Sequence, residues 1–326
     1  MTVSQTNPGQ LHPPEGEEPE SRIVQVGPAQ QLEAVQRLVA VGSPSDRANA
    51  QRFMHYSKTN GIQLDAMWGR VDREGRIVQA VLAVPNPGRT AMIFASHPGS
   101  PQEVPSLGAL IDHTAAQLAT GGIQLAQLLL EPQESLERQA ALTGGFTELA
   151  TLTYLQRPVS KRMLPPSPKW CDGAATETYV EHLYDDFLLA VIASYEDTLD
   201  CPKLFGLREP QDILAGHRAT GKFDPSLWTL LRVDAKPVGV VLLNPFPEQR
   251  TIELVYLGLA PVIRGRGLGR QLLRHALRLL HGRRERIVTL AVDEHNAPAL
   301  RIYRAEGFRD ELRRVALIRS LRGNSP

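Results

Sequence analysis

A short glycine-rich loop, Arg264 to Gly269, carries the residues best suited to binding a phosphate. It reads RGRGLG, follows the apolar stretch Ile252 to Ala260, and precedes leucines that recur on one helical face between Leu268 and Leu280. A strand that delivers such a turn to a helix N-terminus makes an anion cradle, because unpaired backbone N–H groups and the positive end of the helix dipole point the same way. The glycine spacing fits neither a dinucleotide fingerprint nor a Walker loop. We therefore expect a phosphate site of another kind.

Two ionisable residues could move protons near this loop. Glu253 is the only charge in its apolar stretch, so burial is expected to raise its pKa toward that of a working base. It could equally face solvent or fix a substrate in place. Tyr303 lies in a predicted helix, Asn296 to Glu306, where it is either a proton donor or a core aromatic residue.

The loop resembles motif A of the GNAT superfamily of acetyl-CoA-dependent acyltransferases, R/Q-x-x-G-x-G/A, here Arg264, Gly267 and Gly269. A second family pattern, N-x-x-A-x-x-x-Y-x-x-x-G-F, is reproduced downstream by Asn296, Ala299, Tyr303 and Gly307-Phe308. Each match alone has a structural explanation, such as a helix N-cap for Asn296. Because the two occur together and in order, the chain from about Tyr179 onward is identified as a member of this family.

The resemblance implies a binding site for acetyl-CoA. Backbone groups of Leu257, Gly258 and Leu259 are expected to bind the pantetheine arm as if it were an added strand, with a local bulge at Gly258. Residues implied for the coenzyme phosphates and the adjoining site are Arg264, Gly265, Arg266, Gly267, Leu268, Gly269, Arg270 and Asn296. Arg270 and Arg274 are also available to the 3′-phosphate, whereas Arg278 is expected on a solvated helix face.

The family also implies roles for the two ionisable residues. An alkylamine, with a pKa of about 10.4, must lose a proton before it attacks a thioester. Glu253 lies eleven residues before Arg264, where several family members carry a glutamate base. Tyr303 matches the family's general acid, which returns a proton to the CoA thiolate, whose pKa is about 8.5.

The same order of elements occurs in both halves of the chain. Each half ends in a strand, a helix, a Gly-Phe pair and another strand, with the pairs at Gly145-Phe146 and Gly307-Phe308. We therefore predict an α/β protein of two GNAT-like domains, each a mixed central sheet flanked by helices. The expected organisation is a disordered tail (1–21), a degenerate GNAT-like domain (22–160), a proline-rich linker (161–172) and an acetyl-CoA-binding catalytic domain (173–326).

The first half lacks the coenzyme signature. After its strand Thr90 to Ser96 no R-x-x-G-x-G follows, and Pro101 and Pro105 remove backbone donors that phosphates would use. Ala141 stands where Tyr303 stands in the second half. We expect this copy to have lost coenzyme binding and to wall the acceptor cleft or to stabilise the pair, in a layout similar to that of mycothiol synthases.

The acceptor is expected to be a primary amine of a small molecule or of a protein. From Tyr179 to Asp200 there are acids but no Lys or Arg, which would attract a cationic amine if they do not simply form a charged helix face: Glu181, Asp185, Asp186, Glu196, Asp197 and Asp200. The alternative function is a non-catalytic acyl-CoA-binding or sensing protein.

Composition argues against other classes of protein. A net charge of +1 does not suit a nucleic-acid binder, no apolar run could span a membrane, and no metal-binding motif is present. The two cysteines, Cys171 and Cys201, are too few for a disulfide framework and favour a reducing cytoplasm.

Overall fold

The computed structural model describes residues 22–40, 46–59, 61–159 and 164–322. The predicted tail (1–21) and residues 161–163 of the predicted linker lie outside the described residues. The rest of the linker lies alongside helix α7 (Leu268–Leu279). Gln271 accepts a hydrogen bond from the Lys169 N–H at 3.0 Å, and Arg278 donates to the Pro165 carbonyl at 2.7 Å. Arg278 is therefore held against the linker, and the expectation of a merely solvated side chain was wrong.

The chain contains both helices and strands, as a mixed α/β protein does. The strands are β1 (Arg22–Gln25), β2 (Met67–Val71), β3 (Ile77–Asn86), β4 (Thr90–Ala95), β5 (Leu125–Leu130), β6 (Thr147–Pro158), β7 (Ala174–Thr178), β8 (Trp228–Val233), β9 (Lys236–Phe246), β10 (Thr251–Leu259), β11 (Ile287–Asp293) and β12 (Arg309–Ser320). The other helices are α1 (Gln31–Leu38), α2 (Asp46–Thr59), α3 (Val104–Thr120), α4 (Ser135–Thr143), α5 (Tyr184–Tyr195), α6 (Pro210–Ala219) and α8 (Ala297–Ala305).

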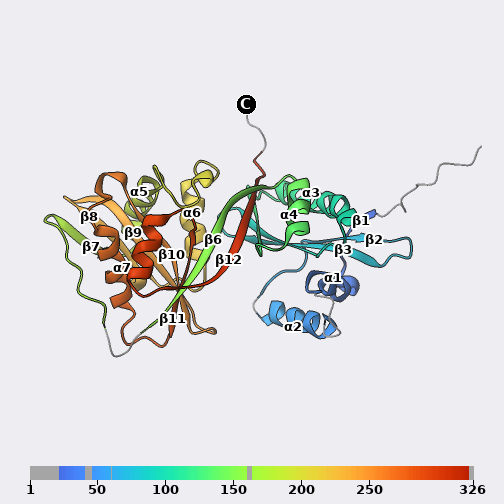
Figure 1. Ribbon diagram of the computed structural model, residues 1–326, viewed down its shortest axis with the longest axis horizontal. Coiled ribbons are helices and arrows are strands. Elements are labelled where there is room, and N and C mark those ends of the chain that lie inside the picture. Colours follow the sequence, from blue (N-terminus) through green and yellow to red (C-terminus); the bar gives the residue numbers. More distant parts are fainter. Residues whose placement is uncertain (1–21, 41–45, 60, 160–163, 323–326) are drawn as a thin grey trace, which may run out of the picture.

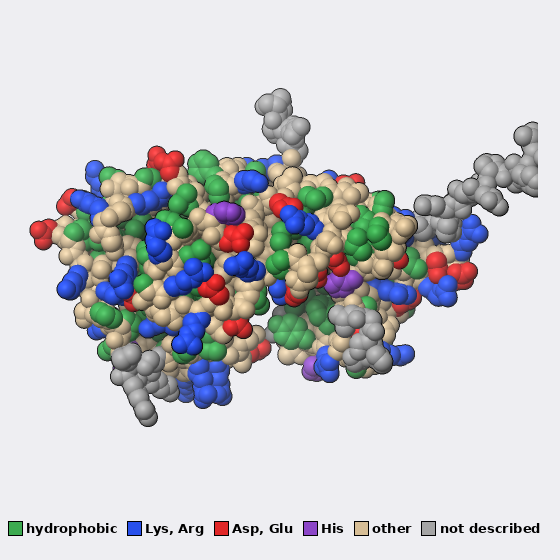
Figure 2. Space-filling view, viewed as in Figure 1, with side chains coloured by type: hydrophobic (Ala, Val, Ile, Leu, Met, Phe, Trp, Pro, Cys, Tyr) green, Lys and Arg blue, Asp and Glu red, His purple; other side chains and the backbone are tan. Residues whose placement is uncertain are grey.

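Within the described residues the strands join one 12-stranded sheet in the order β1-β2-β3-β4-β5-β12-β6-β11-β10-β9-β8-β7. The two halves exchange their last strands: β12 pairs with β5 of the first half, and β6 pairs with β11 of the second. Strands β6 and β12 then pair with each other along the centre of the molecule (Figure 1). A notch separates the two halves at the lower edge of the same view (Figure 2).

The two halves repeat one design, so the predicted fold class is confirmed. In each half a parallel pair forms over three rows, Thr251 to Glu253 of β10 on β11 and Thr90 to Met92 of β4 on β5. Helices α7 and α3 cover the sheet beside these pairs and bury the two largest apolar cores. The leucine face predicted for α7 is buried as expected: Leu268, Leu272, Leu273, Ala276, Leu277 and, just past the helix end, Leu280.

Among the described residues no helix is both long and apolar enough to cross a membrane.

The strand exchange predicts that the second half cannot fold stably alone. Without β6, residues 164–326 would leave the edges of β11 and β12 unpaired, and open edges promote aggregation. We expect this fragment to be insoluble or to lack a cooperative thermal transition, and co-expression with residues 1–163 to restore it. A soluble fragment whose Tm equals that of the full chain would contradict this expectation.

Candidate active site

A pocket of about 770 Å³ opens where strands β10 and β11 separate. The two strands pair only as far as Glu253 and Thr289, and the pocket is lined from the next residue, Leu254, onward. Its walls are the remainder of β10, the end of β11, the glycine-rich loop and helix α8. Because parallel strands normally pair along their length, this gap leaves backbone groups free to pair with an extended ligand.

The glycine-rich loop forms one end of the pocket. Gly265 and Gly267 both have a φ of +76°, which L side chains rarely adopt, although no heavy atom lies within 4 Å of a Cβ added to either. Backbone conformation, not space, therefore requires glycine at both positions. Gly267 is the N-cap of α7, and the first N–H groups of a helix have no acceptor within it. The predicted anion cradle is thus present as a backbone arrangement.

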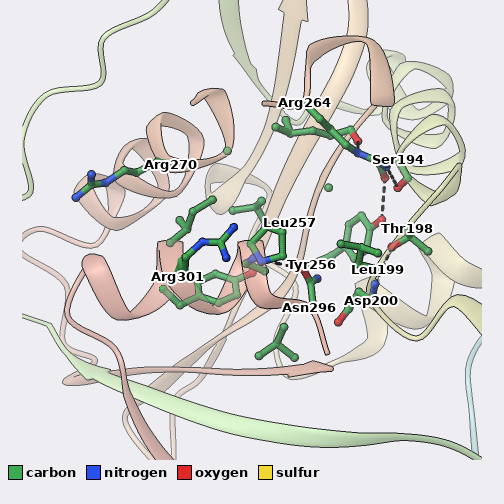
Figure 3. Close-up of a pocket in the computed structure, with 18 of the residues that line it drawn as sticks. Ser194, Thr198, Leu199, Asp200, Tyr256, Leu257, Arg264, Arg270, Asn296 and Arg301 are labelled. Atoms are coloured by element: carbon green, nitrogen blue, oxygen red, sulfur yellow. Dashed lines mark hydrogen bonds between the residues drawn. The ribbon is translucent and has the colours of Figure 1, made fainter. Parts of the chain in front are cut away.

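The side chain of Arg264 does not point to this cradle. Its guanidinium donates to four backbone carbonyls: Leu259 at 2.9 Å, Asp197 at 3.0 Å, Ser194 at 2.9 Å and Glu196 at 2.7 Å. Figure 3 shows the Arg264 side chain directed toward Ser194. Four of the five donors of the guanidinium are therefore used to tie the loop to the end of α5. Any phosphate binding at this position would depend mainly on the loop backbone that Arg264 holds in place.

Two arginines of α7, Arg270 and Arg274, share one carboxylate partner. Glu306, buried behind α8, accepts from Arg270 Nε at 2.5 Å and from Arg274 Nε at 2.8 Å. Arg270 lines the pocket and is 41% exposed, whereas Arg274 is 16% exposed, so Arg270 is the better placed of the two to meet a phosphate. Arg301 of α8 also lines the pocket and is exposed. Sequence reasoning missed Arg301 because it occupies an unspecified position of the downstream pattern, between Ala299 and Tyr303.

The bulge in β10 lies earlier than expected. The register on β9 shifts between Leu254 and Tyr256, so Val255 is the extra residue and the prediction of a bulge at Gly258 was wrong. Gly258 has a different role, because a Cβ added there would lie 2.4 Å from Ser194 Oγ and 2.7 Å from Tyr256 Cε1. Glycine lets α5 pack directly on the strand. There the Tyr256 hydroxyl and Ser194 Oγ are 2.7 Å apart (Figure 3).

Tyr303 lies inside the pocket and is only 7% exposed. Burial, together with the nearby Asp200 carboxylate, raises the pKa of its hydroxyl, so Tyr303 remains protonated at neutral pH. Its ring packs edge-on against Phe308, with centroids 5.7 Å apart. The packing role and the proton-donor role are therefore compatible in this tyrosine.

Glu253 lies at the row where the strands separate, and burial raises its pKa. It stands opposite Asn244 in the register of β9, and Asn244 donates to the carbonyls of His217 and Thr220 at 2.7 and 2.6 Å. Opposed residues in a sheet point to the same face. Glu253 therefore faces helix α6, on the side of the sheet away from α7.

Asp200 is a pocket residue that motif reasoning did not single out. It accepts from the Asp293 N–H at 2.9 Å, and burial raises its pKa. Asn296 acts as the predicted N-cap of α8, since its side chain accepts from the Ala299 N–H at 3.3 Å. Cys201 is buried, and burial raises the pKa of its thiol, which disfavours a nucleophilic thiolate. Only folding brings these residues from three elements together.

The other acids of the predicted roof are largely occupied elsewhere. Asp186 pairs with Arg232 at 2.6 Å, and Glu181 accepts from the Tyr179 hydroxyl at 3.0 Å. Asp197 and Asp200 are the members of the set that line the pocket. Of the two explanations for these acids, a charged helix face therefore fits Asp186 and Glu181 better than attraction of a cationic amine.

Comparison with known proteins gives a consistent result. Residues 191–308 match the acetyltransferase (GNAT) family. A mycothiol acetyltransferase of Frankia casuarinae is 28% identical over 304 residues, which cover 89% of this chain and 85% of that protein. A second, of Streptomyces coelicolor, is 29% identical over 60% of this chain and 61% of its own length. A GCN5-related N-acetyltransferase of Sphaerobacter thermophilus shares the fold over 93% of this chain and 96% of its own, with a TM-score of 0.60 and 18% identity.

A negative charge placed in the backbone cradle should strongly weaken coenzyme binding. We expect Gly267→Asp to weaken the affinity for CoA by about 100-fold or more, because the carboxylate would compete with and repel the phosphates. Gly267→Asn is the matched control, since it has nearly the same shape and backbone strain without the charge. Titration calorimetry on both variants measures the difference, and equal affinities would show that phosphates bind elsewhere.

Proposed function

Because the second half of the chain belongs to the acetyltransferase (GNAT) family, we propose that the protein transfers an acetyl group from acetyl-CoA to a primary amine by direct attack. The observation that carries this proposal is that one pocket is lined both by the backbone cradle of Gly265 and Gly267 and, at the gap between the strands, by Tyr303. A phosphate-bearing ligand with an extended arm fits that arrangement. Its thioester would then lie near the row of Glu253.

The proposed reaction needs two proton movements. The acceptor nitrogen forms a bond to the acetyl carbon, the carbon–sulfur bond breaks, and the amine proton leaves toward Glu253, directly or through water. The raised pKa of Glu253 makes it a better base than an exposed carboxylate. Tyr303 donates a proton to the departing thiolate and then regains one from water. Because burial raises the pKa of Tyr303, its hydroxyl stays protonated until negative charge develops on sulfur.

The names of the two relatives support a small-molecule acceptor over a protein amine. Both are called mycothiol acetyltransferases, a name that refers to a small-molecule acceptor. The alternative, a non-catalytic acyl-CoA sensor, keeps the cradle but needs neither Glu253 nor Tyr303. Incubation with acetyl-CoA, an amine panel and a thiol reagent separates the two, because only an enzyme releases CoA in an amine-dependent way.

Removing the Tyr303 hydroxyl should impair turnover and spare binding. Tyr303→Phe keeps the ring against Phe308, so we expect kcat to fall by about 100-fold or more while KM for acetyl-CoA changes little. Steady-state kinetics with the best amine of the panel measures both constants. Full kcat in this variant would mean that water protonates the thiolate and that Tyr303 is a packing residue.

The base role of Glu253 should appear in the pH profile. Its carboxyl must be ionised to accept a proton, so kcat/KM for the amine should fall as pH drops through its raised pKa, and Glu253→Gln should remove that limb. The loss in the Gln variant should be largest near neutral pH and shrink in alkaline solution, where free amine is plentiful. A loss of the same factor at every pH would favour substrate positioning instead.

A further inference from the structure

Two polar atoms near helix α6 are buried and lack a hydrogen-bond partner among the described residues. They are Nε of Arg208, just before the helix, and Nε2 of His217, in its last turn. Buried donors and acceptors are nearly always paired, since an unpaired one costs about 1–3 kcal/mol. A polar ligand that bound beside the candidate active site could pair with both atoms.

Arg208 is a cation without a carboxylate partner. Its Nη2 donates to the Asp212 carbonyl at 2.8 Å, but the Asp212 carboxylate pairs instead with Arg89 at 2.6 Å. No other described carboxylate forms an ion pair with Arg208, and burial lowers its pKa. Gly88 and Gly216 make room for the guanidinium, because a Cβ added at either would lie 2.8 or 2.7 Å from Nη2. The chain thus places a positive charge at the contact between its two halves.

His217 is a neutral neighbour of that charge. Its ring stacks on Tyr256, with centroids 5.1 Å apart and planes at 24°, while Tyr195 stacks on Tyr256 at 5.5 Å. Burial and the nearby Arg208 lower the pKa of His217 to about 3, so the imidazole is uncharged at neutral pH. The ring can therefore offer one N–H group from Nε2 without adding charge.

Both residues lie on the acceptor side of the sheet. Tyr256 lines the coenzyme pocket, and Tyr256 packs with α5 and α6 in the same apolar cluster (Figure 3). Glu253 is three residues earlier on β10, a separation of about 10 Å along a strand, and faces α6 through its row with Asn244. Because His217 stacks on Tyr256, a pocket residue, the Arg208–His217 pair lies next to the pocket on the side of the sheet that Glu253 faces.

We propose that Arg208 and His217 bind a carboxylate group on the acceptor, whose amine lies at Glu253. This inference rests on the proposed function and adds the class of acceptor, an amino acid or another amine that carries a carboxylate. Nε–H of Arg208 and Nε2–H of His217 would each donate to a carboxylate oxygen, and the guanidinium would supply the charge. Charge-assisted bonds of this kind are the stronger ones in proteins.

Matched amines test the proposal. We would compare kcat/KM for β-alanine with ethylamine and for 5-aminopentanoate with butylamine, at equal concentrations of free amine. We expect the carboxylated member of at least one pair to be favoured by about 10-fold or more. Arg208→Gln should lower kcat/KM for the carboxylated amine by about that factor, so that the two members of the pair become equal. Arg218→Gln, on the exposed surface of the same helix over Phe223, is the control and should keep the preference.

A second measurement separates this inference from the proposed function. If the protein acetylates no amine at all, binding of β-alanine and 5-aminopentanoate to the CoA-saturated protein is measured by calorimetry. We expect binding of one of them that is lost in Arg208→Gln and weakened in His217→Phe, which keeps the stack on Tyr256 but removes Nε2. The proposal is overturned if neither carboxylate is preferred or bound, or if the preference survives in Arg208→Gln.

Discussion

The separation of strands β10 and β11 is the constraint on which the candidate site depends. Three paired rows hold the strands together as far as Glu253 and Thr289, and beyond them each strand is held from its other side, β10 by β9 and β11 by β6. Strand β6 comes from the first half, so one wall of the gap is fixed by the strand exchange. A pocket between parallel strands would otherwise close by pairing. The two halves are therefore coupled through the sheet itself.

Arg264 connects this gap to the helices above it. Ordering the loop costs chain entropy, because two of its residues are glycines held at positive φ and glycine loses more conformational freedom than any other residue. Four hydrogen bonds from one guanidinium, to carbonyls at the end of α5, just after it and in β10, offset that cost. Arg264 therefore has a structural role: it holds the loop so that backbone N–H groups point into the pocket.

Sequence patterns predicted local features well and long-range ones poorly. The loop, the leucine face of α7 and the N-cap Asn296 depend on residues close in sequence, and the structure has all three. The strand exchange was not predictable, because β6 and β12 have similar patterns and either partner would satisfy them. Arg208 was missed for the same reason, and Asp200 could be named only as one of six acids, since the surroundings of both are assembled from residues distant in the chain.

The first half shows that a gap between parallel strands can exist without a binding site for an extended ligand. Its strands β4 and β5 also pair over three rows and then part, so the fold alone produces the opening. There, however, His97 Nδ1 lies 2.8 Å from a carboxylate oxygen of Glu137, which joins the chain after β4 to the first turn of α4. A histidine–carboxylate contact bridges the elements that in the second half are separated by the pocket. A duplicated fold can therefore keep its geometry while a few substitutions across the gap replace a place for an extended ligand with an internal contact.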